Sequence, residues 1–171
     1  MGSGVLVDSS AFPFSLQCFG RIDSASSRKS TTRYCFKSGN GAISWKSKLQ
    51  ECIVTSTTEV EYVAASNTAT EALWLSRLAH TFRQVDSDSA PVVYIDSQGG
   101  VALSKNLIHH NAFKHMDVRY HFVLDCVISG KIGFKKISTA DNVVDVMTKC
   151  LSADHFRSLR HQMGVMKIQS D

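Results

Sequence analysis

The chain has 171 residues, of which 43% are hydrophobic and 20% charged, and its formal net charge is +4. This size and balance suit one globular domain and argue against a chain that is disordered throughout. No apolar run reaches the length of a membrane-spanning helix, and the N-terminus lacks the basic and apolar regions of a secretory signal. The mild basic excess is compatible with a nucleic-acid partner and equally with an ordinary solvated surface.

The five cysteines indicate a reducing environment. They are scattered and none belongs to a C-x-x-C pair, so neither a disulfide framework nor a structural zinc site is expected. We therefore expect an intracellular protein, cytoplasmic or nuclear, without a membrane partner. The histidine pairs, 109–110 and His115 with His121, lack a third ligand at fixed spacing and are expected to be ordinary surface or core residues.

The first half of the chain predicts a hairpin and a long helix. Residues 1–20 have a weak pattern and are expected to be an atypical, poorly ordered segment. From Arg33 to Ser47, apolar and polar residues alternate around Gly39-Asn40-Gly41, which predicts two short strands joined by a turn. Apolar spacings near three and four then predict a helix from Thr57 to about Arg83. Its predicted buried stripe consists of Val60, Val63, Ala64, Ala72, Leu75, Leu78 and Ala79.

The second half alternates short strands and helices. Pro91 to Asp96 is predicted to be a buried strand, and residues 97–106 a short helix. A further helix is predicted from Lys114 to Gly130, where the glycine ends it, and a strand over 131–139. One or two closing helices follow, the first capped by Asp141. This order, with at least one strand–helix–strand crossover, predicts a mixed α/β domain.

Three acidic residues stand in positions that suit a metal site. Glu61 falls in the first turn of the long helix, Asp96 at the end of a buried strand, and Asp145 in the first turn of a late helix. Ligands of α/β sheets collect beyond the carboxyl ends of strands, and Mg²⁺ prefers oxygen ligands. Two such ions about 4 Å apart would activate water and stabilise the leaving oxygen of a phosphodiester.

Each acid also has an ordinary structural explanation. Thr58 and Glu61 fit a capping box, Asp145 favours a helix N-terminus through the helix dipole, and Asp96 could cap the helix that follows it. The basic residues also have two interpretations, contact with nucleic-acid phosphates or simple solvation at the surface. Those that would contact phosphates are Arg28, Lys29, Lys135, Lys136 and Lys149.

Six blocks occur in one order and resemble a known family. They are GAISWKSKLQ, STTEVEYVAAS, EALWLSRL, VVYIDSQGGVALSKN, KHMDVRYHFV and NVVDVMTKCL. Together they resemble the C-terminal ribonuclease H domain of copia-type retrotransposon Pol polyproteins, from about Arg28 to about Val165. The resemblance implies a ribonuclease H-like α/β fold, a five-stranded mixed sheet flanked by helices, over residues 21–165. Residues 1–20 would precede this domain and residues 166–171 would form a C-terminal tail.

The resemblance also implies an activity, cofactors and partners. The family cleaves the RNA strand of RNA–DNA hybrids with two Mg²⁺ ions, for which Mn²⁺ can stand in, beside the reverse transcriptase portion of the polyprotein. By motif, Glu61, Asp96 and Asp145 match the metal-binding catalytic acids. The first-strand acid would be Asp23. Contacts to nucleic acid are expected from Arg28, Lys29, Ser97, Gln98 and Lys149.

One block departs from the family pattern. Family members carry an acid-rich first strand before the R-K-S-T segment, whereas here Arg28 to Thr31 follows CFGRIDSASS. The family's tryptophan and one acid are missing, so the strand resembles an eroded or rearranged copy with Asp23 as the nearest substitute. Two further hypotheses therefore stand beside an active ribonuclease. One is an inactive relic with at most weak nucleic-acid binding, and the other is a protein-interaction scaffold.

Overall fold

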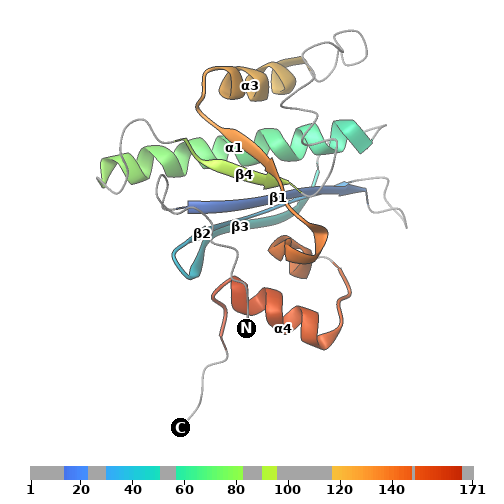
Figure 1. Cartoon of the computed structure of the whole chain (residues 1–171). Helices are drawn as coiled ribbons and strands as arrows, with labels where there is room; N and C mark the ends of the chain where they lie inside the picture. The colour runs from blue at the N-terminus through green and yellow to red at the C-terminus, as the bar shows by residue number, and fades with distance from the viewer. Residues whose placement is uncertain are drawn as a thin grey trace.

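The computed structural model describes residues 14–22, 30–50, 57–82, 90–95, 117–147 and 149–166 (Figure 1). Its strands are β1 (Phe14–Ile22), β2 (Ser30–Ser38), β3 (Gly41–Leu49), β4 (Val92–Ile95) and β5 (Gly133–Lys136). Its α-helices are α1 (Thr57–Thr81), α3 (Asp117–Ile128) and α4 (Ala153–Gln162), and two 3₁₀ helices are η1 (Thr139–Asp141) and η2 (Val143–Met147). None of the helices in these ranges is long and apolar enough to cross a membrane.

The strands form one sheet with β1 at its centre. The order is β3-β2-β1-β4-β5. The pairs β1–β2 and β2–β3 are antiparallel, whereas β1–β4 and β4–β5 are parallel. Parallel neighbours need a crossover connection, and α3 lies between β4 and β5 in the chain. The expected mixed α/β class is confirmed.

Helices cover both faces of the sheet. Along β2, Tyr34 and Phe36 join a core cluster with residues of α1, while Cys35 packs with residues of η2 and α4. Because successive strand residues point to opposite faces, α1 lies on one face and η2 and α4 lie on the other (Figure 1). On the α1 side, α3 forms an outer layer, in which Val123 packs against Ala65. The result is a sheet between two helical layers.

The predicted hairpin is confirmed. A turn at residues 39–40 joins β2 to β3, and Gly39 has a φ of 55°, a left-handed conformation that suits glycine. The end of α4 supports the hairpin, because the Ala42 N–H donates to the Met163 carbonyl at 2.9 Å. A shift of register between Phe36 and Lys37 bends the pair near its turn.

The long predicted helix is confirmed as α1, but its buried stripe is narrower than expected. Residues from Val60 to Leu75 that were predicted to be buried are buried, and so is Ala79. Leu78 is the exception, because 36% of its surface is exposed. At 3.6 residues per turn, Leu75 and Ala79 stay on the sheet side and Leu78 falls at its margin. Trp74 and Phe82, each four residues from Leu78, are exposed as well.

Two predicted boundaries need correction. The limit expected between residues 20 and 21 falls inside β1, which pairs with β2 from Phe14 onwards. The first closing helix, expected to be capped by Asp141, is instead two 3₁₀ turns, because the backbone of Asn142 is extended and separates them, whereas α4 is a closing α-helix. Asp141 ends η1, and its carboxylate accepts a hydrogen bond from the Ser138 hydroxyl at 2.9 Å. The short helix predicted over 97–106 lies outside the described residues.

Candidate metal and nucleic-acid site

Asp145 is the predicted acid whose surroundings are best defined. It lies in η2, and its side chain is only 2% exposed. The neighbouring Val143 and Val144 pack into the core between η2, β2 and α4, which draws the aspartate inward. Among the described residues, Oδ1 of Asp145 accepts no hydrogen bond. A buried carboxylate oxygen of this kind is suited to a cation.

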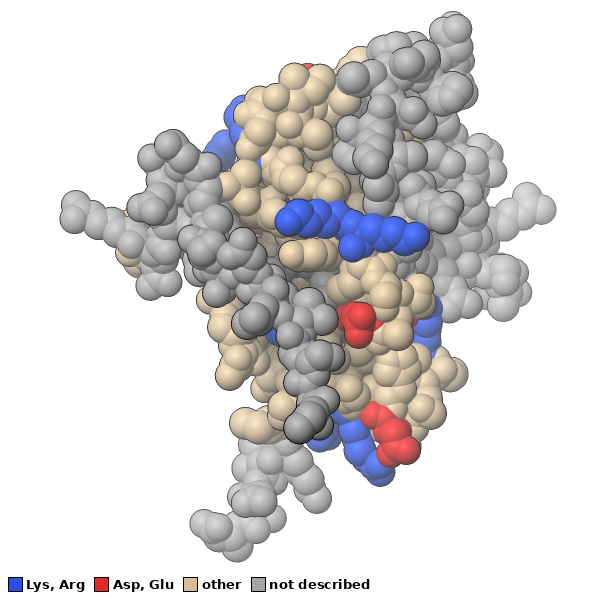
Figure 2. Space-filling model, viewed as in Figure 1, with Lys and Arg blue, Asp and Glu red and all other residues tan. Residues whose placement is uncertain are grey.

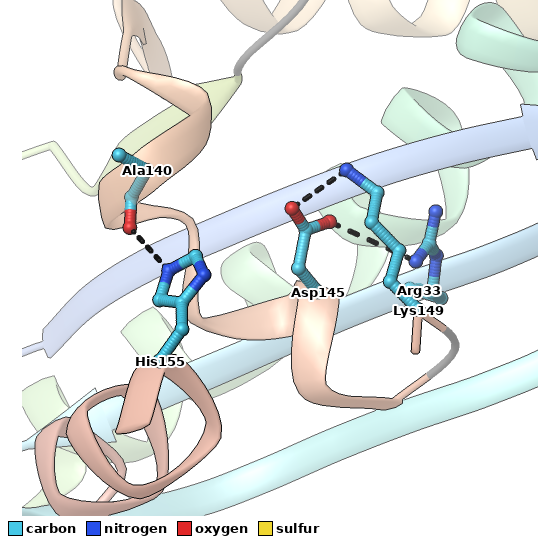
Figure 3. Close-up of polar contacts among 5 residues, drawn as sticks. All are labelled: Arg33, Ala140, Asp145, Lys149 and His155. Atoms are coloured by element: carbon cyan, nitrogen blue, oxygen red, sulfur yellow. Dashed lines mark hydrogen bonds and ion pairs between the residues drawn. The ribbon is translucent and has the colours of Figure 1, made fainter. Parts of the chain in front are cut away.

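Lys149 holds the other carboxylate oxygen of Asp145. Its Nζ lies 2.6 Å from Asp145 Oδ2 (Figure 3). The Lys149 N–H also donates to the Asp145 carbonyl at 2.9 Å, so one helical turn places the lysine four residues on, beside the carboxylate. The sequence hypothesis assigned Lys149 to phosphate binding. The structure gives it an acidic partner within its own chain, and its contact with phosphate stays a prediction.

Arg33 approaches the same carboxylate from the sheet. Its side chain is 0% exposed, and its Nη1 lies 3.9 Å from Asp145 Oδ1 (Figure 3). Arg33 occupies the face of β2 that packs on η2, two residues from Cys35. The sequence hypothesis did not include Arg33, and arginine side chains are mostly exposed in folded proteins. No sequence signal identified it as a buried ion-pair partner.

Glu61 lies on the other face of the sheet, near the start of α1. It is partly exposed. Buried Gln50, just after β3, fixes this end of the helix: its Nε2 donates to Thr32 Oγ1 at 2.9 Å and to the Val60 carbonyl at 3.2 Å. Glu61 and Asp145 therefore come from elements on opposite faces of the sheet. Side chains placed in this way can share a ligand only near a strand end or a gap between strands.

β1 is the common neighbour of the elements that carry the predicted acids. It contacts α1, β4 and η2. Its parallel pairing with β4 ends where Cys18 lies opposite Ile95, the residue before Asp96. Beyond that point β1 runs on to Ile22 without β4 beside it. None of the nine residues of β1, FSLQCFGRI, is an aspartate or a glutamate.

The other predicted site residues lie outside the described ranges, and their roles stay predictions. They are Asp23, Arg28, Lys29, Asp96, Ser97 and Gln98. Within the ranges that the structure covers, no three His, Cys, Asp or Glu side chains come together as a potential metal site. The structure thus brings Asp145 together with Lys149 and places Glu61 on a separate element that also borders β1.

Comparison with known proteins identifies the family to which the chain belongs. The chain is 42% identical to the "Retrovirus-related Pol polyprotein from transposon TNT 1-94" of Nicotiana tabacum over 146 residues, 85% of this chain and 11% of that protein. It is 36% identical to the corresponding polyprotein from transposon RE2 of Arabidopsis thaliana over 139 residues, 81% of this chain and 10% of that protein. The chain belongs to the copia-type retrotransposon Pol family. It spans about a tenth of the length of these Pol relatives.

A solved structure shows which fold this Pol segment has. The N-terminal RNase H domain of rv2228c from Mycobacterium tuberculosis, solved as a fusion with maltose binding protein, superimposes with a TM-score of 0.54. The superposition covers 85% of this chain and 94% of that chain at 11% identity. The Pol segment therefore has a ribonuclease H-like fold. No protein-family model matches the chain.

Proposed function

We propose that this Pol segment binds RNA–DNA hybrids and that its cleavage of the RNA strand is strongly impaired. The observation that carries the proposal is the composition of β1. This strand borders α1, β4 and η2, the elements that hold or precede the predicted acids, yet it contains no carboxylate. A site built from these elements would lack a ligand at its centre, where a metal-dependent nuclease needs negative charge.

Hybrid binding is supported by family membership and by charge. The chain has a net charge of +4, and Lys135 and Lys136 at the end of β5 are exposed. Figure 2 shows basic side chains lying together near the middle of one face of the molecule. Recognition would rest on duplex shape, phosphates and the 2′-hydroxyl groups rather than on base sequence. The reverse transcriptase portion of such a polyprotein is the proposed protein partner.

The metal ligands of the proposed site are Glu61, Asp96 and Asp145. Mg²⁺, or Mn²⁺ in its place, would polarise the phosphodiester and lower the pKa of bound water. Asp145 fits such an ion in chemistry, because its buried Oδ1 accepts no hydrogen bond from the described residues. β1 adds no fourth ligand. β1 ends at Ile22, the residue before Asp23. Ile22 is four residues past Cys18, and therefore lies about 13 Å along the strand from the residue that pairs with the end of β4.

The test restores a carboxylate to β1. Cys18 is the last β1 residue in register with β4, and its cross-strand partners Ile95 and Tyr34 both pack toward α1. We expect Cys18→Asp to raise Mg²⁺-dependent cleavage of a labelled hybrid about 100-fold or more over the parent, because even outer-shell partners of metal sites change activity about 10–100-fold. Cys18→Asn, similar in shape and uncharged, is the matched control and should leave cleavage at the parent level.

Two outcomes would contradict the proposal separately. Cleavage by the parent chain as fast as by Cys18→Asp, with both folded by circular dichroism, would show that the site is not impaired. Failure of the parent to bind a hybrid in fluorescence anisotropy at low salt would reject hybrid binding itself. In the Cys18→Asp background, Asp145→Asn should abolish the gained cleavage, which ties the activity to the proposed ligands.

A further inference from the structure

The two basic residues beside Asp145, Lys149 and Arg33, differ in how far their side chains are exposed to solvent. Asp145 is 2% exposed, Lys149 24% and Arg33 0%. The lysine is therefore the partner that reaches solvent, and the arginine is the partner fixed within the fold. Figure 3 shows that the two cations approach different oxygens of the carboxylate, in agreement with their contacts to Oδ2 and Oδ1.

These contacts place two positive charges around one negative charge. A divalent ion bound to Asp145 would lie about 2.1 Å from a carboxylate oxygen, while the Lys149 ammonium is 2.6 Å from Oδ2. At Oδ2 a metal ion and the Lys149 ammonium cannot occupy the same side of the oxygen. At Oδ1, which accepts no hydrogen bond from the described residues, the ammonium on the other oxygen of the same carboxylate still repels a divalent ion and neutralises part of the charge that would hold it. Lys149 consequently competes with any metal ion for Asp145.

We infer that Lys149 is a displaceable counter-cation that keeps Asp145 closed to divalent metal until a nucleic-acid phosphate attracts the lysine away. Of the two cations that the described residues place beside Asp145, Lys149 is the one suited to this part, because Arg33 is wholly buried in the sheet whereas a lysine stem that reaches solvent can rotate. Phosphate is the matching alternative partner for a lysine ammonium. Nucleic acid and metal would then bind with positive coupling, each favouring the other. This coupling rests on the proposed hybrid binding, whereas the competition at Asp145 does not.

The first experiment measures Mn²⁺ binding without nucleic acid, by titration calorimetry and by the electron paramagnetic resonance signal of unbound Mn²⁺. Lys149→Met removes the competing charge and should raise Mn²⁺ affinity about tenfold, the effect of one nearby unit charge in a partly hydrated site. Lys149→Arg keeps the charge and should bind Mn²⁺ like the parent. Arg157→Gln breaks the exposed pair between Arg157 and Asp154, at 2.8 Å on α4, and serves as a remote control without effect.

A second substitution locates the gained affinity. Adding Asp145→Asn to Lys149→Met should return Mn²⁺ binding to the parent level, because the carboxylate that the lysine had covered is gone. Circular dichroism and thermal unfolding of every variant establish that the comparison is between folded proteins. Equal Mn²⁺ affinities of the parent and folded Lys149→Met would overturn the inference, and so would a gain that survives Asp145→Asn.

The last arm tests the coupling with a short RNA–DNA hybrid, whose binding is measured by anisotropy. Saturating hybrid should raise the Mn²⁺ affinity of the parent and leave that of Lys149→Met nearly unchanged, because its carboxylate is already open. No change in a parent that demonstrably binds hybrid would reject the coupling. If the hybrid does not bind, the proposed function fails. The Mn²⁺ affinities of the parent and of Lys149→Met, measured without nucleic acid, still test whether Lys149 competes with metal for Asp145.

Discussion

Cys35 illustrates at the scale of one residue how the sheet face toward η2 is packed. Its side chain is 0% exposed and contacts a core that includes Val143, Val144 and Leu159. Burial raises the pKa of the Cys35 thiol from 9.0 to about 11, and the positive charge of Lys37 opposes this shift. The thiol is therefore a neutral core group that resists ionisation where an exposed thiol would not.

This shift predicts a pH dependence of stability. Between pH 9 and about 11 the folded state keeps the Cys35 proton while the unfolded state loses it, so the free energy of unfolding falls as pH rises through this window. A two-unit shift amounts to about 3 kcal/mol over the whole window. Urea unfolding of the parent and of Cys35→Ala at several pH values measures the effect. Equal slopes in the two proteins would show that Cys35 does not cause it.

At the scale of an element, α1 combines two different surfaces. The residues that face the sheet include Ala72 and Leu75, which are 1% and 4% exposed. On another side, Trp74, Leu78 and Phe82 follow one another at intervals of four and are 55%, 36% and 65% exposed. The helix is also tied to the sheet by a polar contact, because the Ser44 hydroxyl donates to Glu71 Oε1 at 2.7 Å. Because most of the stability of a helix in a protein comes from packing of its apolar face, we expect the stability of α1 to depend mainly on the sheet-facing stripe.

Two leucines three residues apart should thus respond differently to truncation. We expect Leu75→Ala to reduce the free energy of unfolding by about 2–5 kcal/mol, because it opens a cavity in the core. We expect Leu78→Ala, at the exposed margin, to cost less than about 1.5 kcal/mol, since less apolar surface leaves the interior. Chemical denaturation of both variants measures the difference. A larger loss for Leu78→Ala would mean that the stripe has been assigned to the wrong side.

At the scale of the whole molecule, the C-terminal end of α4 closes the fold onto the β2–β3 hairpin. Met163 is 8% exposed and accepts a hydrogen bond from the Ala42 N–H at 2.9 Å. Gly164 follows with a φ of +73°, and a Cβ at this position would lie only 2.7 Å from Gly41 Cα and would also press on the Asn40 carbonyl. A contact between residues more than 120 positions apart along the chain therefore requires glycine here.

A pair of glycine substitutions tests this closure. Gly130 also has a positive φ, +67°, but a Cβ there meets nothing within 4 Å. Gly130→Ala should cost about 1 kcal/mol of unfolding free energy, from backbone conformation alone. Gly164→Ala adds a steric clash with the hairpin backbone and should cost about 2–4 kcal/mol. Thermal and urea unfolding give both values, and equal losses would show that α4 does not press on the hairpin.

Local pattern was sufficient for much of the secondary structure. The Gly39-Asn40-Gly41 turn, the 25-residue helix α1 and the strand before Asp96 all follow from short-range rules of turn chemistry and periodicity. Errors arose where a decision depended on distant contacts. The exposure of Leu78 depends on how α1 is rotated against the sheet. The strand β1 is weak as a local pattern and is defined by pairing with β2 and β4 on either side.

The candidate site divides in the same way. Motif order was enough to select Asp145 and Lys149, because their identity and spacing are written in the chain. That the two form an ion pair, and that wholly buried Arg33 stands 3.9 Å from the same carboxylate, depends on the packing of η2 against β2. The charges around a side chain depend on its neighbours in space. The four-residue spacing could suggest Lys149 as a partner of Asp145, but it could not suggest Arg33, which comes from a distant strand.

By itself the sequence determined the family, the α/β class and the absence of any carboxylate from residues 14–22, since these depend only on residue identity and order. Only the tertiary structure decided that this stretch is the central strand, in register with the end of β4 at Cys18, and that Asp145 is already matched by cations. Strand register and ion pairing are set by long-range packing and burial, which residue order leaves open.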